Sequence, residues 1–312
     1  MGTPQFAVPT LKALSDAGHD IACVITQPDR PAGRGRKPAP PPVKIAAQAL
    51  GLRVEQPARV SSESTMAMIK DMTPDAAVVA AFGQKIKPEL LAIPIYGFVN
   101  VHPSLLPLYR GAAPIQRSMM NGDELTGVTI MYMDEGWDSG DIGIVKHVSV
   151  PDDATGKQAE ELLADVGGEL MVHFLRLLET GKAPRIPQDD SQATYAPKIT
   201  DADTVVDWTM PARAIRQRVR ALSPDPAVRC VFDGTRVKIL GASLVPAEWH
   251  APEGAMPGQL WPQKQLGLIV GCGADGREGL ILDMLQPAGG RAMGGAEFAR
   301  GRRIEAGRRL DS

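Results

Sequence analysis

The sequence has few cysteines and no long apolar run, and both features narrow the class of protein. Its three cysteines, Cys23, Cys230 and Cys272, are far apart and form no C-x-x-C pair. This odd, scattered set argues against a disulfide framework and a zinc site, and it fits a reducing cytoplasm. No apolar segment approaches the length of a membrane span, and no secretory leader is recognisable at the amino end. We therefore expect a cytoplasmic protein without a membrane-spanning segment.

A strong net charge is also missing, although the chain is long enough for two domains. The formal charge is -2 over 312 residues, which provides no overall attraction to nucleic acid. A nucleic-acid partner would have to be held by a local basic patch. With 44% hydrophobic residues, the chain can build substantial cores, and its length favours two domains.

Short apolar runs alternate with longer amphipathic stretches in the first part of the chain. This alternation is typical of a parallel sheet with helices on both faces. We therefore expect a doubly wound, mostly parallel, Rossmann-like α/β domain over residues 1–182. The predicted strands are 20–26, 75–81, 97–101, 127–133 and 142–150, and the predicted helices are 5–17, 43–50, 118–123 with its preceding turn, and 155–180.

The pattern changes after a polar segment at 183–203, which is rich in proline and has no period. We expect this segment to be a surface linker. Short alternating strands separated by Gly/Pro turns fill residues 204–312. They predict a small antiparallel all-β domain, either an OB-like barrel or a sandwich.

The first residues, "MGTPQFAVPTLKALSDAG", lead directly into a predicted helix. A doubly wound sheet normally feeds its first helix from a strand, and that strand is missing here. We therefore expect the natural chain to begin several residues upstream, with Met1 as an internal methionine.

The segment "NVHPSLLPLYRGAAPIQ" (100–116) ends an apolar run with two polar residues. Side chains alternate along a strand, so Asn100 and His102 face the same side. Ligands bind beyond the carboxyl ends of parallel strands, which is where this pair would lie. Without a function, His102 would hydrogen-bond a buried carbonyl and Asn100 would cap a turn. The prolines and glycine that follow at once favour a binding or catalytic site.

A second loop, "MDEGWDSGD" (133–141), carries Asp134, Glu135, Asp138 and Asp141. Its spacing does not match the EF-hand pattern, so we expect no metal. A solvated turn explains two or three of these four carboxylates. A carboxylate near His102 would favour the charged imidazole and fix its orientation.

Two basic segments are candidates for nucleic-acid contact. The first, 27–44, reads as an exposed loop between a strand and a helix. The second is the helix 212–222, whose cations recur at intervals of three and four. Runs of charged residues more often form a solvated surface than a binding site. The helix is equally well explained as an ordinary amphipathic helix that makes no contact with nucleic acid. The cations are Arg30, Arg34, Arg36, Lys37 and Lys44 in the first segment, and Arg213, Arg216 and Arg220 in the second.

The motifs N-x-H at 100–102, "SLLPLYRGAAPIQ", "GVTIMYMDEGWDSGDI" and "GTPQFAVP" resemble those of the 10-formyltetrahydrofolate-dependent formyltransferases. The likeness runs from residue 1 to about 301. It implies a catalytic set of Asn100, His102 and Asp138, with no metal. Pro103 and Leu108 depart from the family pattern, which usually has glycine and a basic residue there. The same resemblance implies a folate site formed by Phe82, Gly83, Gln84, Ile86, Ser104, Leu105, Leu106, Pro107 and Asp134.

The resemblance further implies that the formyl acceptor is the amino group of initiator methionyl-tRNA, bound by the first basic segment. The helix 212–222 is a second candidate for tRNA contact, and we expect a monomer. A small amine, such as glycinamide ribonucleotide or an amino sugar, is the rival acceptor. A dinucleotide-dependent oxidoreductase would need G-x-G-x-x-G after the first strand, where the chain has "GTPQFA". A non-catalytic RNA-binding module is a third class.

Overall fold

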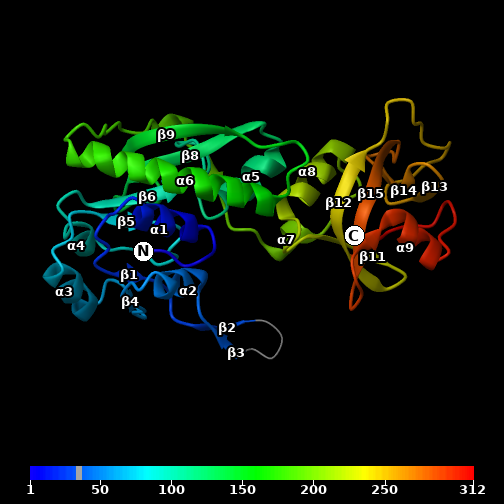
Figure 1. Ribbon diagram of the computed structural model, residues 1–312. Helices are drawn as coiled ribbons and strands as arrows, with labels where there is room; N and C mark the ends of the chain where they lie inside the picture. The colour runs from blue at the N-terminus through cyan, green and yellow to red at the C-terminus, as the bar shows by residue number, and fades with distance from the viewer. Residues whose placement is uncertain (33–36) are drawn as a thin grey trace. The chain divides into compact units, whose positions relative to one another are not determined.

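The computed structural model describes residues 1–32 and 37–312, which form two compact units (Figure 1). Unit 1 comprises Met1–Pro114, Leu125–Ser149 and Glu160–Ala196. Unit 2 comprises Ile115–Glu124, Val150–Ala159 and Pro197–Ser312. Each unit is therefore assembled from segments that are distant in sequence, and the segment 183–203 divides between the units after Ala196.

Unit 1 is built on a sheet in the strand order β5-β6-β8-β9. β6 runs parallel to β5, as expected, whereas β8 runs antiparallel to β6 and β9 antiparallel to β8. A parallel β8–β9 pair would need a crossover of a dozen or more residues, and the nine residues 133–141 form a hairpin loop instead. The strands are β5 (Ala77–Val79), β6 (Phe98–His102), β8 (Leu125–Tyr132) and β9 (Ile142–Ser149).

Two further strands extend this sheet through the first two residues of the chain. β1 (Val24–Ile25) pairs in parallel with β4 (Val54–Glu55). Gly2 donates its N–H to the carbonyl of Ile25 at 3.1 Å and forms a parallel bridge with Ala80. Met1–Gly2 therefore lies between β1 and β5, in the place of a strand.

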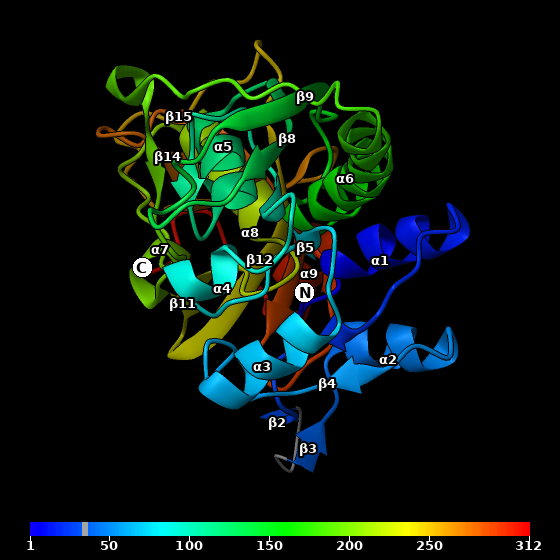
Figure 2. The same ribbon diagram turned by 90° about the vertical axis from the view of Figure 1, so that its left-hand side faces the viewer.

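The helices of unit 1 lie beside the strands of this unit (Figure 2), and they bury apolar side chains there. The long helix α6 buries Leu163, Met171 and Phe174 completely, as its apolar spacing predicts. A Cβ at Gly143 on β9 would lie 2.4 Å from the Phe174 ring, so glycine permits the close approach of helix and sheet. The helices are α1 (Ala7–Asp16), α2 (Pro42–Ala49), α3 (Glu63–Asp71), α4 (Pro88–Leu91) and, from Glu160 onward, α6 (Gly156–Glu179).

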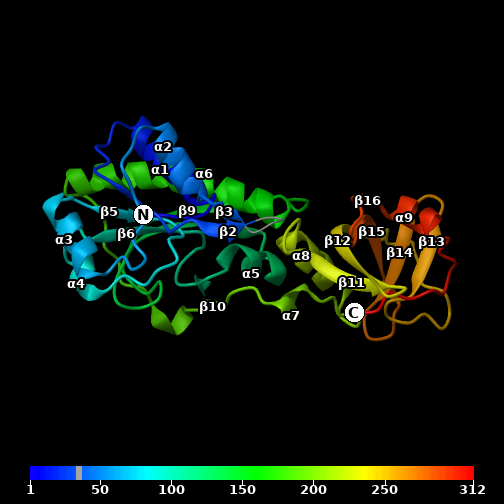
Figure 3. The same ribbon diagram turned by 90° about the horizontal axis from the view of Figure 1, so that it is seen from below.

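Unit 2 contains an antiparallel sheet in the order β11-β12-β15-β14-β13, with β16 beside β15 (Figure 3). Its two edges are joined by the last residues of the chain, because Asp311 bridges Val231 and Arg309 bridges Gln259. These bridges close the sheet into a small barrel, one of the two architectures that the alternating pattern left open. The strands are β11 (Val228–Phe232), β12 (Thr235–Leu244), β13 (Leu260–Gln263), β14 (Gly267–Cys272), β15 (Glu278–Pro287) and β16 (Met293–Gly294).

Helices cover this barrel and share one apolar core with it. The core includes Ile215 and Val219 of α8 and Phe298 of α9. Cys230 and Cys272 lie in this core as free thiols, and burial raises the pKa of each to about 12. The helices of unit 2 are α5 (Pro114–Asn121, from Ile115), α7 (Asp201–Thr204), α8 (Ala212–Leu222) and α9 (Gly295–Gly301). Over the described residues, no helix combines the length and apolarity needed to span a bilayer.

One ion pair ties α5 to α7 in unit 2. Arg117 donates two hydrogen bonds to the Asp203 carboxylate, at 2.7 and 2.9 Å, and Thr200 donates two more. These contacts, Arg117 foremost, hold the pKa of Asp203 far below its ordinary value. A depressed carboxyl pKa means that this stabilisation is present above the unfolded-state pKa and is lost as the pH falls toward the folded-state value.

We expect Asp203→Asn to lower the free energy of unfolding at pH 7 by roughly 1–3 kcal/mol, because hydrogen bonds to a charged group are lost. The difference from wild type should shrink below about pH 4, where the unfolded carboxyl becomes protonated. Urea unfolding at several pH values measures both effects. Asp201→Asn is the control, since that carboxylate is 93% exposed. Equal losses in both variants would contradict the prediction.

Candidate active site

β6 places Asn100 and His102 on one face of the sheet. The His102 ring is buried, and its Nε2–H donates to the carbonyl of Tyr109 at 3.0 Å. The buried-carbonyl alternative is therefore correct for one ring nitrogen and leaves Nδ1 for another partner. Asn100 is half-buried, and among the described residues nothing hydrogen-bonds its carboxamide. This amide is available to a ligand.

The acidic loop 133–141 folds back over this face of the sheet. It leaves β8 at Tyr132, which pairs with Val99, yet it brings Asp138 to the other end of β6. There the Asp138 carboxylate lies 3.7 Å from Nδ1 of His102. The sheet therefore presents a carboxamide, an imidazole and a carboxylate side by side.

A glycine fixes the position of the Asp138 carboxylate. The N–H of Gly111 donates to Asp138 Oδ2 at 2.9 Å. Gly111 has φ +119°, and a Cβ there would lie 2.9 Å from the carbonyl oxygen of Ala196. Both facts restrict this position to glycine. The "RGAAP" motif thus serves the site through its backbone.

Gln188 holds the same loop through its main chain. Its amide donates to the carbonyls of Asp138 and Gly140, at 2.8 and 2.7 Å. The Gln188 oxygen accepts two hydrogen bonds from the buried guanidinium of Arg110, which also pairs with Asp190. The sequence analysis places Gln188 in the predicted linker 183–203, and no motif or periodic spacing in that segment indicates its role beside Asp138.

The other carboxylates of the acidic loop have local roles. Asp134 accepts from Ser139 Oγ and from the N–H of Gly136, which stabilises the loop itself. Asp141 pairs with Arg185 at 2.8 Å. Within residues 1–32 and 37–312, no group of three or more histidine, cysteine or acidic side chains is arranged to hold a metal.

The loop after β6 is fastened to β8 by Thr129, which is fully buried. The Thr129 hydroxyl donates to the carbonyl of Ser104 at 2.7 Å and accepts from the N–H of Leu106 at 3.2 Å. Ser104 is itself buried and donates to the carbonyl of Leu108. Of the four predicted folate contacts here, only Leu105 and Pro107 are partly exposed.

The segment "AFGQKI" follows β5 and lies beside the end of β6, since Val79 pairs with Asn100. Phe82 and Ile86 turn their side chains into the core. Gln84 bonds the main chain of Val60 and Pro57. Gly83 adopts a left-handed φ of +79°. The backbone is therefore the part of this segment that can meet a ligand.

The first basic segment contains a short antiparallel ribbon of β2 (Arg30–Ala32) and β3 (Lys37–Ala39), where an open loop was predicted. Figure 1 shows this ribbon projecting from unit 1. Arg30 bonds Gln27, and Lys44 on α2 pairs with Asp29 at 2.9 Å. Two of the predicted contacts, Arg34 and Arg36, lie outside the described residues, and Lys37 lies in β3.

The arginines of α8 are used within unit 2. Arg216 makes a two-pronged ion pair with Asp152. Arg220 donates to the carbonyls of Pro151 and Ala154. Arg213 is exposed. The amphipathic-helix alternative therefore accounts for two of the three arginines.

The site can stabilise a negative oxygen and take up a proton. The Asn100 amide supplies a neutral donor, and a proton arriving at Nδ1 of His102 meets the Asp138 carboxylate. This combination suits attack of an amine on a carbonyl carbon.

Family comparisons cover both units. The protein-family model described as formyl transferase matches residues 1–175. A second family model, described as formyl transferase, C-terminal domain, matches residues 198–303. The methionyl-tRNA formyltransferase of Pelotomaculum thermopropionicum is 43% identical over 96% of this chain and 94% of its own. That of Heliobacterium modesticaldum is 44% identical over 99% and 98%.

Among solved structures, the N-formyltransferase from Helicobacter canadensis, crystallised with folinic acid and dTDP-3-aminofucose, has a TM-score of 0.64 to this chain. The alignment covers 90% of this chain and 97% of that one at 16% identity. At this identity the likeness concerns the fold alone.

We expect Thr129→Val to lower the free energy of unfolding by roughly 1–3 kcal/mol, because buried main-chain groups of the loop lose their partner. Urea unfolding measures this loss. Thr129→Ser is the matched control, since it keeps the hydroxyl. A valine variant at least as stable as the serine variant would contradict the prediction, because only valine lacks the hydroxyl.

Proposed function

Since the chain belongs to the formyl transferase family, we propose that it transfers a formyl group from 10-formyltetrahydrofolate to the amino group of methionyl-tRNA, with the initiator tRNA as acceptor. The observation that carries this proposal is the identity of 43% to a methionyl-tRNA formyltransferase over nearly the whole of both chains. The match includes unit 2, which a small-amine acceptor would not require.

In this proposal Asn100, His102 and Asp138 form the catalytic set. 10-Formyltetrahydrofolate, when bound, supplies the electrophilic formyl carbon. The Asn100 amide donates to the formyl oxygen as negative charge develops there. His102 keeps its Nε2–H on the Tyr109 carbonyl, so Nδ1 receives the proton of the attacking amine. The Asp138 carboxylate, 3.7 Å from Nδ1, stabilises the imidazolium.

The proposed folate site lies along the end of the sheet beside Asn100. The backbone of residues 82–86 would form hydrogen bonds with the edge of the pterin ring, because main-chain N–H and C=O groups complement the donors and acceptors of that ring. Leu105 and Pro107, both partly exposed, would pack against the ring. Asp134 would contribute mainly by holding its own loop.

We assign the proposed RNA contact to the β2–β3 segment in preference to α8. The predicted cations of residues 27–44 fall within 15 residues of sequence, and they are Arg30, Arg34, Arg36, Lys37 and Lys44. Phosphate contacts of this kind give an affinity that falls steeply with salt. Arg216 and Arg220 are already engaged by Asp152 and by carbonyls. We propose a monomer as the active form.

The experiment that tests the function offers one formyl donor and several acceptors. The purified chain is incubated with 10-formyltetrahydrofolate and, separately, with initiator methionyl-tRNA, elongator methionyl-tRNA and an amino sugar nucleotide. We expect formylation of the initiator species. Formylation of the sugar amine with methionyl-tRNA untouched would establish the rival acceptor.

In the same assay, we expect Asn100→Ala to reduce kcat by a factor on the order of 10² to 10³, because one donor to the developing negative charge is lost. Asn121→Ala is the matched control, since Asn121 is the other asparagine of the chain and is exposed on α5. A near-native kcat for Asn100→Ala would remove Asn100 from the catalytic set.

Gln188→Glu tests whether the hold on the Asp138 loop matters for turnover. Glutamate still accepts from Arg110 but offers no donor to the carbonyls of Asp138 and Gly140. We expect kcat to fall by about 10- to 100-fold, since small displacements of catalytic groups are costly, while the melting temperature stays near wild type. Gln192→Glu, on the neighbouring turn, is the control. Unchanged kcat would show that the loop keeps its position without Gln188.

A further inference from the structure

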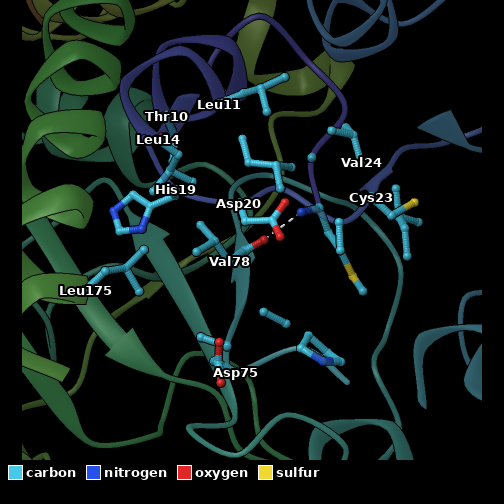
Figure 4. A pocket seen from close by; sticks show the side chains of 18 of the residues that line it. Thr10, Leu11, Leu14, His19, Asp20, Cys23, Val24, Asp75, Val78 and Leu175 are labelled. Carbon is cyan, nitrogen blue, oxygen red and sulfur yellow. Dashed lines mark hydrogen bonds between the residues drawn. The ribbon is translucent and has the colours of Figure 1, made fainter. Parts of the chain in front are cut away.

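Two features lie along β1 and β5 in unit 1. One is a cavity of about 640 Å³, to which α1 and α6 contribute apolar side chains (Figure 4). Its two walls are residues 18–25 and 72–80. The other is a polar cluster around Gln27, which follows β1 and lies beyond those walls. Ligands of parallel sheets bind beyond the carboxyl ends of the strands, so this cluster is the feature that can act on the candidate active site.

The side chain of Gln27 is hydrogen-bonded at both ends, and the residue is only 7% exposed. Its Nε2–H donates to the carbonyl of Phe82 at 3.2 Å, and its Oε1 accepts from Nη2 of Arg30 at 3.1 Å. A carbonyl needs a donor and a guanidinium needs an acceptor, so one orientation of the amide satisfies both neighbours. We call this set of three groups, the Phe82 carbonyl, the Gln27 amide and the Arg30 guanidinium, the Gln27 bridge.

The Phe82 end of the Gln27 bridge holds the turn 82–86. The Phe82 carbonyl also accepts from the Thr3 hydroxyl at 3.0 Å, so both of its lone pairs are used. The N–H groups of residues 82–86 differ, because among the described residues none of them donates to a protein acceptor. These N–H groups belong to the proposed folate site. Gln27 therefore holds one side of the turn and leaves the other side to a ligand.

The Arg30 end of the Gln27 bridge leaves most of the guanidinium available. A guanidinium has five N–H donors in a planar fork. Over residues 1–32 and 37–312, the Arg30 side chain is exposed and hydrogen-bonds Gln27 alone. A phosphate can therefore bind the remaining N–H groups while Nη2 stays on Gln27. Such a contact would immobilise the guanidinium beside Gln27.

Other contacts anchor the main chain around the Gln27 bridge. Gln56, which follows β4, donates to the main-chain carbonyl of Gln27 at 2.8 Å and to Asp29 at 2.7 Å. Lys44 pairs with the same carboxylate at 2.9 Å. Because these contacts already fix the segment, the buried amide of Gln27 is not needed for that purpose. Its position is explained by the two groups that it connects.

We propose that Gln27 is a positioning residue that couples the two substrates. An RNA phosphate on Arg30 keeps the Gln27 amide on the Phe82 carbonyl, and the turn 82–86 then binds the folate more tightly. The gain arises because the turn is already ordered when the second ligand arrives. Coupling between two sites is reciprocal, so the folate tightens RNA binding by the same factor. This inference rests on the proposed function and deepens it.

The test measures binding without turnover. The wild-type chain is titrated calorimetrically with tetrahydrofolate, with and without saturating deacylated initiator tRNA. We expect the tRNA to lower the Kd of tetrahydrofolate by about fivefold, the lower end of couplings between sites. Hydrogen exchange of the peptide that contains residues 82–86 should slow on addition of the tRNA alone, because the turn becomes more ordered.

Two substitutions of Gln27 interrupt the Gln27 bridge. Gln27→Met removes both hydrogen bonds, and Gln27→Glu keeps the acceptor for Arg30 but loses the donor to Phe82. In both variants we expect the tRNA to change the Kd of tetrahydrofolate by less than about twofold. Should the methionine variant fail to fold, Arg30→Met, at an exposed position, interrupts the bridge from its other end.

Gln56→Met is the matched control. It removes two hydrogen bonds from the same segment and leaves the Gln27 bridge intact, so the effect of the tRNA on the Kd should remain as in wild type. Loss of the effect in this control would assign it to the general order of the segment and would overturn the inference.

Two further results would overturn it. One is a wild-type Kd for tetrahydrofolate that the tRNA leaves unchanged, and the other is an undiminished effect of the tRNA in Gln27→Glu. Failure of the proposed function gives a different result, because tetrahydrofolate or the initiator tRNA would then not bind the wild-type chain at all. That outcome would remove the inference together with the function.

Discussion

The contact on which the candidate site depends is that between the Asp138 loop and the end of β6. The carboxylate lies between the ring of His102 and the N–H of Gly111, and the loop backbone is held by Gln188. Asp138 itself has a left-handed φ of +53°, a conformation that persists when surrounding contacts determine it. Without this arrangement, His102 would have a carbonyl on one nitrogen and no charge near the other.

Much of unit 1 serves to hold that contact in place. Thr129 hydrogen-bonds the loop after β6 and so links it to β8. The buried guanidinium of Arg110 donates hydrogen bonds to the side-chain oxygen of Gln188. The two loops come from opposite ends of the antiparallel β6–β8 pair. The site is therefore assembled across the face of the sheet as well as at the ends of its parallel strands. This explains why two polar side chains distant in sequence lie beside it, Arg110 buried and Gln188 half-buried.

The candidate pair Asn100 and His102 and most helices and strands could be predicted from the sequence, since both depend on local order. Alternation along 98–102 puts Asn100 and His102 on one face regardless of what surrounds them. The apolar spacing of 156–179 likewise specifies α6. The periodicity did not indicate that β8 and β9 run antiparallel, because a buried strand has the same apolar pattern in either direction.

The local sequence thus determined which segments become strands and helices, the all-β character of residues 204–312, and the adjacency of Asn100 and His102. Only the tertiary structure decided that the Asp138 loop folds back, that Gln188 and Arg110 support it, and that Arg216 and Arg220 face Asp152. The physical reason is the range of the interactions. Periodicity arises from neighbours along the chain, whereas these partners are separated by 50 to 78 residues. Such pairs meet only through the packing of whole elements, which no short stretch of sequence encodes.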